Sequence, residues 1–177
     1  GLVRVLHSLS FVDDPTRMLR GVRFEQRFGF DFSERTHELM DEALPLLSKL
    51  SGDRIRHELD LIFDEERAVA MFSRLRQLGL LETIHTSLKQ ENGLVSRLHE
   101  ALNVPVPRDF GELPKIGNLD NRRTLGYLVW LLPLPVKDLR AVSKKLRFST
   151  GLKSALPETR ELCKELPSLE GAKNSVW

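Results

Sequence analysis

The chain has 177 residues, of which 41% are hydrophobic and 29% charged, and its formal net charge is +2. That length is enough for one or two compact modules with a real hydrophobic core. The single cysteine, Cys163, excludes a disulfide framework and a cysteine-based zinc site. No apolar run approaches the ~20 residues that cross a bilayer. We therefore expect a cytoplasmic protein that makes no contact with a membrane.

Charge is distributed unevenly along the chain. Residues 1–30 are net basic, residues 31–100 hold 9 basic and 14 acidic side chains, and residues 101–177 hold 13 basic and 8 acidic. This order allows a polyanion to contact the two ends and avoid the middle, but taken alone it favours solvated helix faces that merely differ in charge. The chain begins with Gly1 instead of Met, which indicates a fragment or a processed chain.

Helical periodicity dominates the first third of the sequence. Pro15 suits the first position of a helix, which makes Asp14 its expected N-cap. Ser33 is expected to cap a second helix, which Pro45 interrupts, so that the following residues form a separate turn or a kinked continuation. Ser51 can cap a third helix that carries apolar residues on one face.

Helices are also predicted for the rest of the chain. Apolar residues recur every third position over residues 66–78, and Gly79 is expected to end that helix. Residues 103–121 contain three prolines and two glycines, which indicates a long loop or a module boundary. An apolar helix over residues 122–132 and a basic helix over residues 136–147 follow. No strand pattern is visible, so the predicted fold class is all-α, an irregular multi-helix bundle.

The helix that is expected to begin at Pro15 carries four arginines that indicate a binding site for anions. They fall within a sector of roughly 120°, so one face of the helix is a strip of guanidinium groups. Such a strip is unfavourable unless it meets anions, and guanidinium forks suit phosphates, base edges and carboxylates. The four are Arg17, Arg20, Arg23 and Arg27.

Asp14 and Arg17 are three residues apart and are therefore neighbours on the first helical turn. Together they present a hydrogen-bond acceptor beside a forked donor. Cytosine and adenine each show an exocyclic amine next to a ring-nitrogen acceptor, so this pair can bind either base, whereas guanine and uracil show the opposite order. The same residues also fit an ordinary helix cap with an i,i+3 ion pair, which has no role in recognition.

Two segments of the chain together resemble a known family. Residues 11–30 read FVDDPTRMLRGVRFEQRFGF, and residues 51–59 read SGDRIRHEL. Their order and spacing are similar to the nucleotide-selecting motif and the next motif of class II tRNA nucleotidyltransferases and bacterial poly(A) polymerases. The resemblance implies a template-independent enzyme that adds nucleotides to the 3′ end of tRNA or another RNA.

The resemblance also implies roles for individual residues. Asp14 and Arg17 would make Watson–Crick-like hydrogen bonds to an incoming CTP or ATP, while Asp13 and Arg20 would support the nucleotide site. The second motif would be structural, with Arg54 and Glu58 bracing the first helix. The helix bundle would divide into a neck-like nucleotide-selecting region (1–62), a body (63–132) and basic tail-like helices (133–177). The candidates for RNA-phosphate contacts are Lys137, Arg140, Lys144, Lys145 and Arg147.

The family's catalytic head has no match in this chain. Its Gly-rich loop, its Arg-Arg-Asp motif and the Asp-x-Asp carboxylates that bind two metal ions are missing from the sequence. We therefore expect the parent enzyme to bind Mg²⁺ in its own N-terminal head, and we expect this chain alone to contain no metal site and to be inactive. The alternative is a helical RNA-binding or protein-docking module without nucleotide selection.

Overall fold

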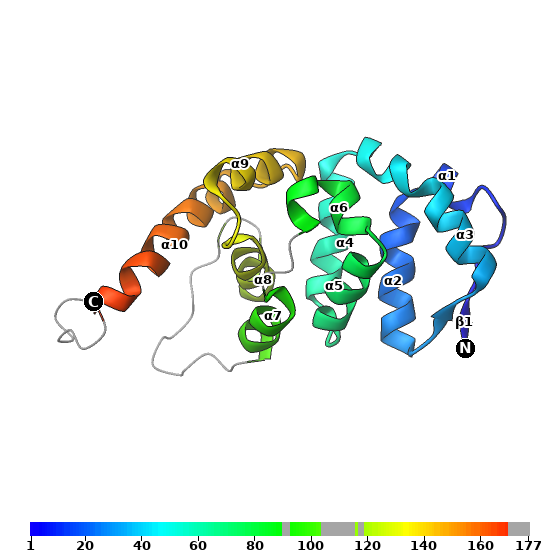
Figure 1. The fold of residues 1–177 in the computed structure, drawn as a ribbon, viewed down its shortest axis with the longest axis horizontal. Coiled ribbons are helices and arrows are strands. Elements are labelled where there is room, and N and C mark those ends of the chain that lie inside the picture. The colour runs from blue at the N-terminus through cyan, green and yellow to red at the C-terminus, as the bar shows by residue number, and fades with distance from the viewer. Residues whose placement is uncertain (90–92, 104–115, 117–118, 170–177) are drawn as a thin grey trace.

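The computed structural model describes residues 1–89, 93–103, 116 and 119–169, and it is built almost entirely of helices. The N-terminus and α10 lie at opposite ends of an elongated molecule (Figure 1). This architecture confirms the all-α prediction. The helices are α1 Ser10–Asp13, α2 Thr16–Phe28, α3 Glu34–Ala43, α4 Gly52–Phe63, α5 Ala68–Gln77, α6 Leu80–Ile84, α7 Leu94–Asn103, α8 Asn121–Leu131, α9 Val136–Lys145 and α10 Thr150–Leu169, with 3₁₀ turns η1 Leu44–Lys49 and η2 Thr86–Lys89.

The prediction that no strand forms was wrong at one point. The strands β1 (Leu2–Val3) and β2 (Asp31–Phe32) pair in parallel, with Leu2 opposite Asp31. Two residues are too short to produce an alternating pattern in the sequence. The pair ties the start of the chain to the segment that follows α2.

The helix boundaries lie close to the predicted ones. Helix α2 begins one residue later than expected, with Pro15 at the cap position. The Ser33 side chain accepts a hydrogen bond from the Thr36 amide and caps α3 as predicted, and η1 forms the separate turn expected at Pro45. Helix α9 stops at Lys145, short of the predicted end. Most of the predicted loop over residues 103–121 lies outside the described residues, and the division into three regions stays a prediction.

Aromatic side chains join the two halves of the molecule. The rings of Phe63 on α4 and Phe72 on α5 have centroids 4.7 Å apart, and Tyr127 on α8 packs edge-on at 4.8 Å from Phe63. Tyr127 and Trp130 are both buried and belong to the core. The rings fix α8 against α4, while α2 lies beside α4 and α5 (Figure 1).

Helix α9 docks on the start of α4 although about ninety residues separate them. A Cβ atom on Gly52 would lie 1.9 Å from the carbonyl oxygen of Lys145, so only glycine permits this approach. The Lys145 ammonium donates to the Ser48 carbonyl at 2.6 Å, and Arg56 Nη1 donates to the Leu146 carbonyl at 3.0 Å. These contacts bring the basic helix to the same end of α4 that faces the start of α2.

Candidate functional site

Asp14 occupies the junction between α1 and α2, where its backbone is extended. Its Oδ1 accepts three hydrogen bonds: from the Thr16 amide at 3.0 Å, from Thr16 Oγ1 at 2.6 Å and from Arg54 Nη2 at 2.7 Å. Within the described part of the chain Oδ2 has no hydrogen-bond partner, and 21% of the side chain is exposed. One carboxylate oxygen is therefore anchored and the other is available as an acceptor.

Arg17 lies on the first turn of α2, three residues after Asp14. Its Nη1 donates to the Ser10 carbonyl at 3.3 Å, and the backbone N–H of Asp14 donates to the same oxygen at 3.3 Å. The side chain is exposed, and no ion pair between Arg17 and Asp14 is formed among the described residues. The guanidinium therefore keeps N–H donors for another partner. This geometry differs from the ordinary i,i+3 ion pair, because Asp14 pairs instead with Arg54 of α4.

The surroundings of Asp14 keep its carboxylate ionised. Burial alone would raise the pKa of Asp14, but the two hydrogen bonds from Thr16 and the positive charges of Arg54 and Arg20 outweigh burial and lower it. At neutral pH the side chain is thus an acceptor only. The amine of cytosine or adenine requires such an acceptor, and the adjacent ring nitrogen requires a donor such as the Arg17 guanidinium.

The remaining arginines of α2 are neutralised inside the protein. Arg20 donates from Nε and Nη2 to Glu58 Oε1 at 3.2 and 2.7 Å, and Arg23 contacts the other Glu58 oxygen at 3.5 Å. Arg27 pairs with Glu65 just beyond α4. The anions that this strip needs are thus supplied largely by carboxylates of the same chain. The prediction that Arg54 and Glu58 brace the first helix is confirmed.

Asp13 and its apolar neighbours form the rim of this site. The Asp13 carboxylate is 54% exposed and lies 3.9 Å from His7 Nε2. Three large apolar side chains on and before α1 are exposed on the same short segment: Leu6, Leu9 and Val12. Sequence reasoning missed this apolar rim, although the run of Leu and Val before Asp13 was its signal.

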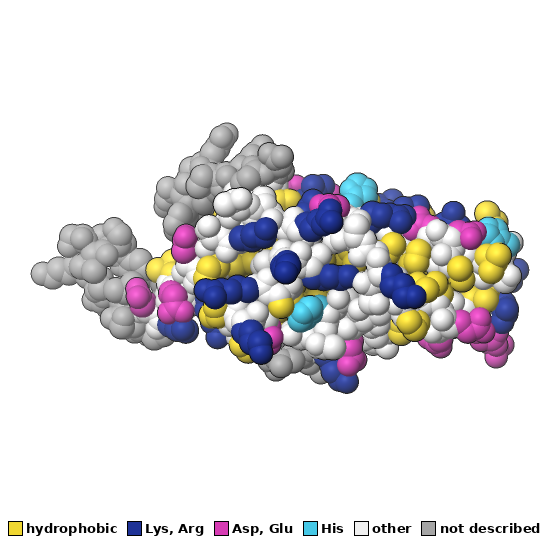
Figure 2. All heavy atoms as spheres, turned by 90° about the horizontal axis from the view of Figure 1, so that it is seen from above, with side chains coloured by type: hydrophobic (Ala, Val, Ile, Leu, Met, Phe, Trp, Pro, Cys, Tyr) yellow, Lys and Arg dark blue, Asp and Glu magenta, His cyan; other side chains and the backbone are white. Residues whose placement is uncertain are grey.

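The five predicted phosphate contacts divide into two groups. Lys145 and Arg147 have partners within the protein, since Lys145 donates to the Ser48 carbonyl and Arg147 Nη1 lies 2.8 Å from Asp53 Oδ2. The other three are exposed and make no hydrogen bond or ion pair with any described residue: Lys137, Arg140 and Lys144. In Figure 2, Lys and Arg side chains gather on this face over α9, while hydrophobic side chains gather toward the N-terminal end.

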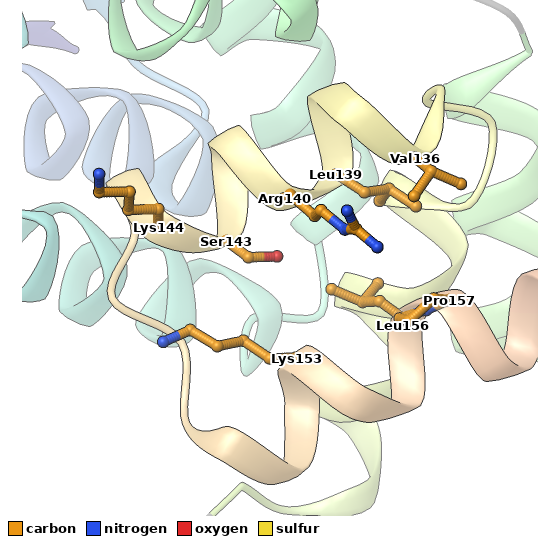
Figure 3. A pocket seen from close by; sticks show the side chains of 8 residues that line it. All are labelled: Val136, Leu139, Arg140, Ser143, Lys144, Lys153, Leu156 and Pro157. Carbon is orange, nitrogen blue, oxygen red and sulfur yellow. The ribbon is translucent and has the colours of Figure 1, made fainter.

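A groove runs between α9 and α10 next to these cations. Arg140, Ser143 and Lys144 contribute from α9, and Lys153 with Leu156 contributes from α10 (Figure 3). The groove therefore has apolar walls and a basic rim. The sequence predicted a basic helix over residues 136–147, but it did not predict that α10 would pack beside α9 and form a groove.

A second cavity beside α8 has a different electrostatic character. Its arginines are already paired, because Arg123 binds Asp64 through two nitrogens and Arg56 binds Asp53. Burial raises the pKa of Asp60, although the hydrogen bond from the Tyr127 hydroxyl at 2.7 Å opposes that rise. We interpret this cluster as structural.

Neither a metal centre nor a membrane-spanning element is found in the described residues. No group of three or more His, Cys, Asp or Glu side chains is placed to hold an ion. No helix among those described is long and apolar enough to cross a bilayer.

Comparison with known proteins identifies the fold and the family. Residues 29–91 match the family described as "Probable RNA and SrmB-binding site of polymerase A". The A-adding tRNA nucleotidyltransferase of Halalkalibacterium halodurans is 38% identical over an alignment of 127 residues, and the match covers 68% of this chain and 30% of that protein. The A-adding enzyme of Aquifex aeolicus is 32% identical over 175 residues, 90% of this chain and 21% of that protein.

Solved structures agree with these relatives. A CCA-adding enzyme in complex with ATP matches with a TM-score of 0.78 and 30% identity, over 97% of this chain and 40% of that chain. The Thermotoga maritima CCA-adding enzyme bound to tRNA matches with a TM-score of 0.76 and 30% identity, again over 97% and 40%. The fold is thus that of the helical neck and body of CCA-adding enzymes.

The chain belongs to the class II tRNA nucleotidyltransferase family, as its two motifs indicated. It spans less than a third of the Halalkalibacterium and Aquifex relatives and two fifths of the two solved chains.

Proposed function

We propose that this chain is the nucleotide-selecting, RNA-binding C-terminal portion of a template-independent tRNA nucleotidyltransferase. The observation that carries the proposal is the arrangement of Asp14, just before α2, and Arg17, on the first turn of α2. Asp14 offers Oδ2 as an acceptor, and Arg17 keeps donors beside it while both residues bond the same Ser10 carbonyl. An exocyclic amine would donate to Oδ2, and the adjacent ring nitrogen would accept from the guanidinium.

This arrangement selects bases by the order of donors and acceptors. CTP and ATP present an amine beside a ring acceptor and match the pair. GTP and UTP place a carbonyl against the carboxylate and an N–H against the guanidinium, and each mismatch leaves a desolvated polar group without a partner. Asp13 and Arg20 support the site from the same short stretch. Because Arg20 is already bound to Glu58, the contribution of Arg20 is to hold α2 in place.

The chemical step needs groups that the described part of the chain does not offer. Phosphoryl transfer of this kind uses carboxylates that clamp metal ions, and the described residues hold no such cluster. The proposal therefore places Mg²⁺ and the reacting phosphates on the parent protein's own N-terminal head. The residues of this chain would bind and orient the base.

RNA would lie along the basic face of α9. Lys137, Arg140 and Lys144 are exposed and have no described partner, so they can neutralise phosphates without breaking internal contacts. Lys145 and Arg147 would contribute less, because both already bind protein groups. Two structural neighbours are described as complexes with tRNA or with ATP, which supports these two classes of partner for the parent protein.

The test is nucleotide choice in the whole protein. Asp14→Ala and Arg17→Ala should each impair the preference for CTP or ATP over UTP and GTP, while the affinity for tRNA stays within about twofold. The readout is single-nucleotide extension of a tRNA primer with each nucleoside triphosphate, alongside tRNA binding. Unchanged nucleotide choice with lost RNA or partner binding would instead favour a docking module without nucleotide selection.

A further inference from the structure

Arg54 reaches from the first turn of α4 to the Asp14 carboxylate at the junction between α1 and α2. Its Nη2 donates to Asp14 Oδ1 at 2.7 Å, and this is its one ion pair among the described residues. The neighbouring charged residues of α4 turn the other way, since Asp53 binds Arg147 and Arg56 binds the Leu146 carbonyl. Arg54 is therefore not part of the contact that holds α9 on α4.

We propose that Arg54, together with Thr16, is a positioning residue that fixes the Asp14 carboxylate by Oδ1 and so presents Oδ2 to the base. This inference rests on the proposed function. It adds a specificity-determining residue outside the pair that touches the nucleotide.

The physical argument begins with the freedom of a carboxylate. Its terminal torsion is broad and two-fold, so a lone Asp14 would exchange its two oxygens freely. Oδ1 instead holds three donors: two from Thr16 on its own chain segment and one from Arg54 across the helix interface. Three directional bonds to one oxygen fix the carboxylate plane and direct the second oxygen outward.

A second effect concerns Arg17. Asp14 and Arg17 are three residues apart at the start of α2, a spacing at which an aspartate and an arginine can form an ion pair. Such a pair between Asp14 and Arg17 would consume both reading groups at once. Because Arg54 already satisfies Asp14, Arg17 rests on the Ser10 carbonyl instead and keeps its donors for the ring nitrogen. Arg54 thus keeps the acceptor and the donor apart.

Replacement of Arg54 is suited to a clean test. The side chain is 51% exposed, so its truncation leaves no buried cavity. A control is Arg35, whose side chain is 62% exposed and forms an i,i+3 pair on α3 with Glu38, a carboxylate that is 53% exposed against 21% for Asp14. Arg54→Lys keeps the positive charge but replaces the guanidinium fork with a single ammonium group, so it should recover part of any activity that Arg54→Ala loses.

The experiment measures KM and kcat for CTP and ATP in the whole protein, with tRNA primer in excess. Arg54→Ala should raise KM about three- to tenfold, the range expected for one lost orienting contact, and leave kcat at saturation within about twofold. Arg54→Lys should restore part of the KM, and Arg35→Ala should match the wild type. An unchanged KM in Arg54→Ala, or an equal rise in Arg35→Ala, would overturn the inference.

Two further variants separate the possible failures. Thr16→Val keeps the side-chain shape, removes the 2.6 Å hydroxyl donor and should raise KM in the same direction even if Arg54→Ala folds poorly. In an Arg17→Ala background, Arg54→Ala should have a smaller effect, because the competing ion pair cannot form. If Arg17→Ala alters nucleotide choice but neither Arg54→Ala nor Thr16→Val alters KM, the inference fails and the proposed function stands. If Arg17→Ala changes nothing, the proposed function itself fails.

Discussion

The carboxylate of Glu58 is the strongest anchor between α2 and α4, and its removal gives a sharp test of the fold. Glu58 is 2% exposed and accepts from Arg20 at 3.2 and 2.7 Å and from Arg23 at 3.5 Å. Glu58→Ala would leave Arg23, which is 11% exposed, with the 3.6 Å contact to Glu65 as its remaining ion pair among the described residues. Breaking a buried ion pair from one side costs about 3–5 kcal/mol.

Solvent reduces the free-energy cost of Glu58→Ala at Arg20. Arg20 is 42% exposed and regains solvent when Glu58 is removed, so we expect a loss of about 2–4 kcal/mol in the free energy of unfolding. For a chain of this length that corresponds to a fall in Tm of about 4–16 °C.

Urea unfolding and a thermal melt measure this loss directly. The matched control is Glu38→Ala, which removes a carboxylate that is 53% exposed and should cost less than about 1 kcal/mol. Equal losses in the two variants would refute the reasoning that burial makes Glu58 important.

Three further predictions concern the contact between α4 and α9, the pH dependence of nucleotide binding and the salt dependence of tRNA binding. Gly52→Ala should lower the free energy of unfolding by about 2–3 kcal/mol in a denaturant titration, because the new methyl group meets the Lys145 carbonyl and neither backbone can yield; a wild-type midpoint would contradict this. The lowered pKa of Asp14 means that nucleotide affinity is kept at neutral pH and lost as pH falls through that pKa. In Arg54→Ala the pKa of Asp14 should rise. A titration of CTP binding across the acidic range should therefore show the loss of affinity at higher pH in Arg54→Ala than in Arg54→Lys. Coincident curves would contradict this role of Arg54. Arg140→Ala should reduce the slope of log affinity for tRNA against log salt by about 0.7–0.9, and an unchanged slope would mean that this residue contacts no phosphate.

Local sequence signals predicted the helices well where a helix has a clear start or stop. Ser33 caps α3 through its side chain, and Gly79 adopts a φ of 70° at the end of α5. The β1–β2 pair was missed because two paired residues carry no period. Helix α6 was missed because it begins at Leu80, directly after Gly79, the residue that was expected to end the preceding helix.

The sequence predicted which residues form the candidate site but not which residues they contact. The i,i+3 spacing placed Asp14 and Arg17 on one turn, and the family resemblance gave them a role. The partner of Asp14 could not be derived, since Arg54 lies 40 residues away and the choice between it and Arg17 depends on how α4 packs on α2. The same limit applies to Lys145, whose ammonium is held by a carbonyl almost a hundred residues away.

The most direct test of base reading by Asp14 and Arg17 is a structure of the whole protein with CTP or ATP bound. We expect the exocyclic amine of the base at about 2.7–3.2 Å from Asp14 Oδ2 and the adjacent ring nitrogen at a similar distance from the Arg17 guanidinium. Arg54 should remain on Oδ1. A base bound away from the start of α2, or one whose amine faces neither oxygen of Asp14, would contradict the account.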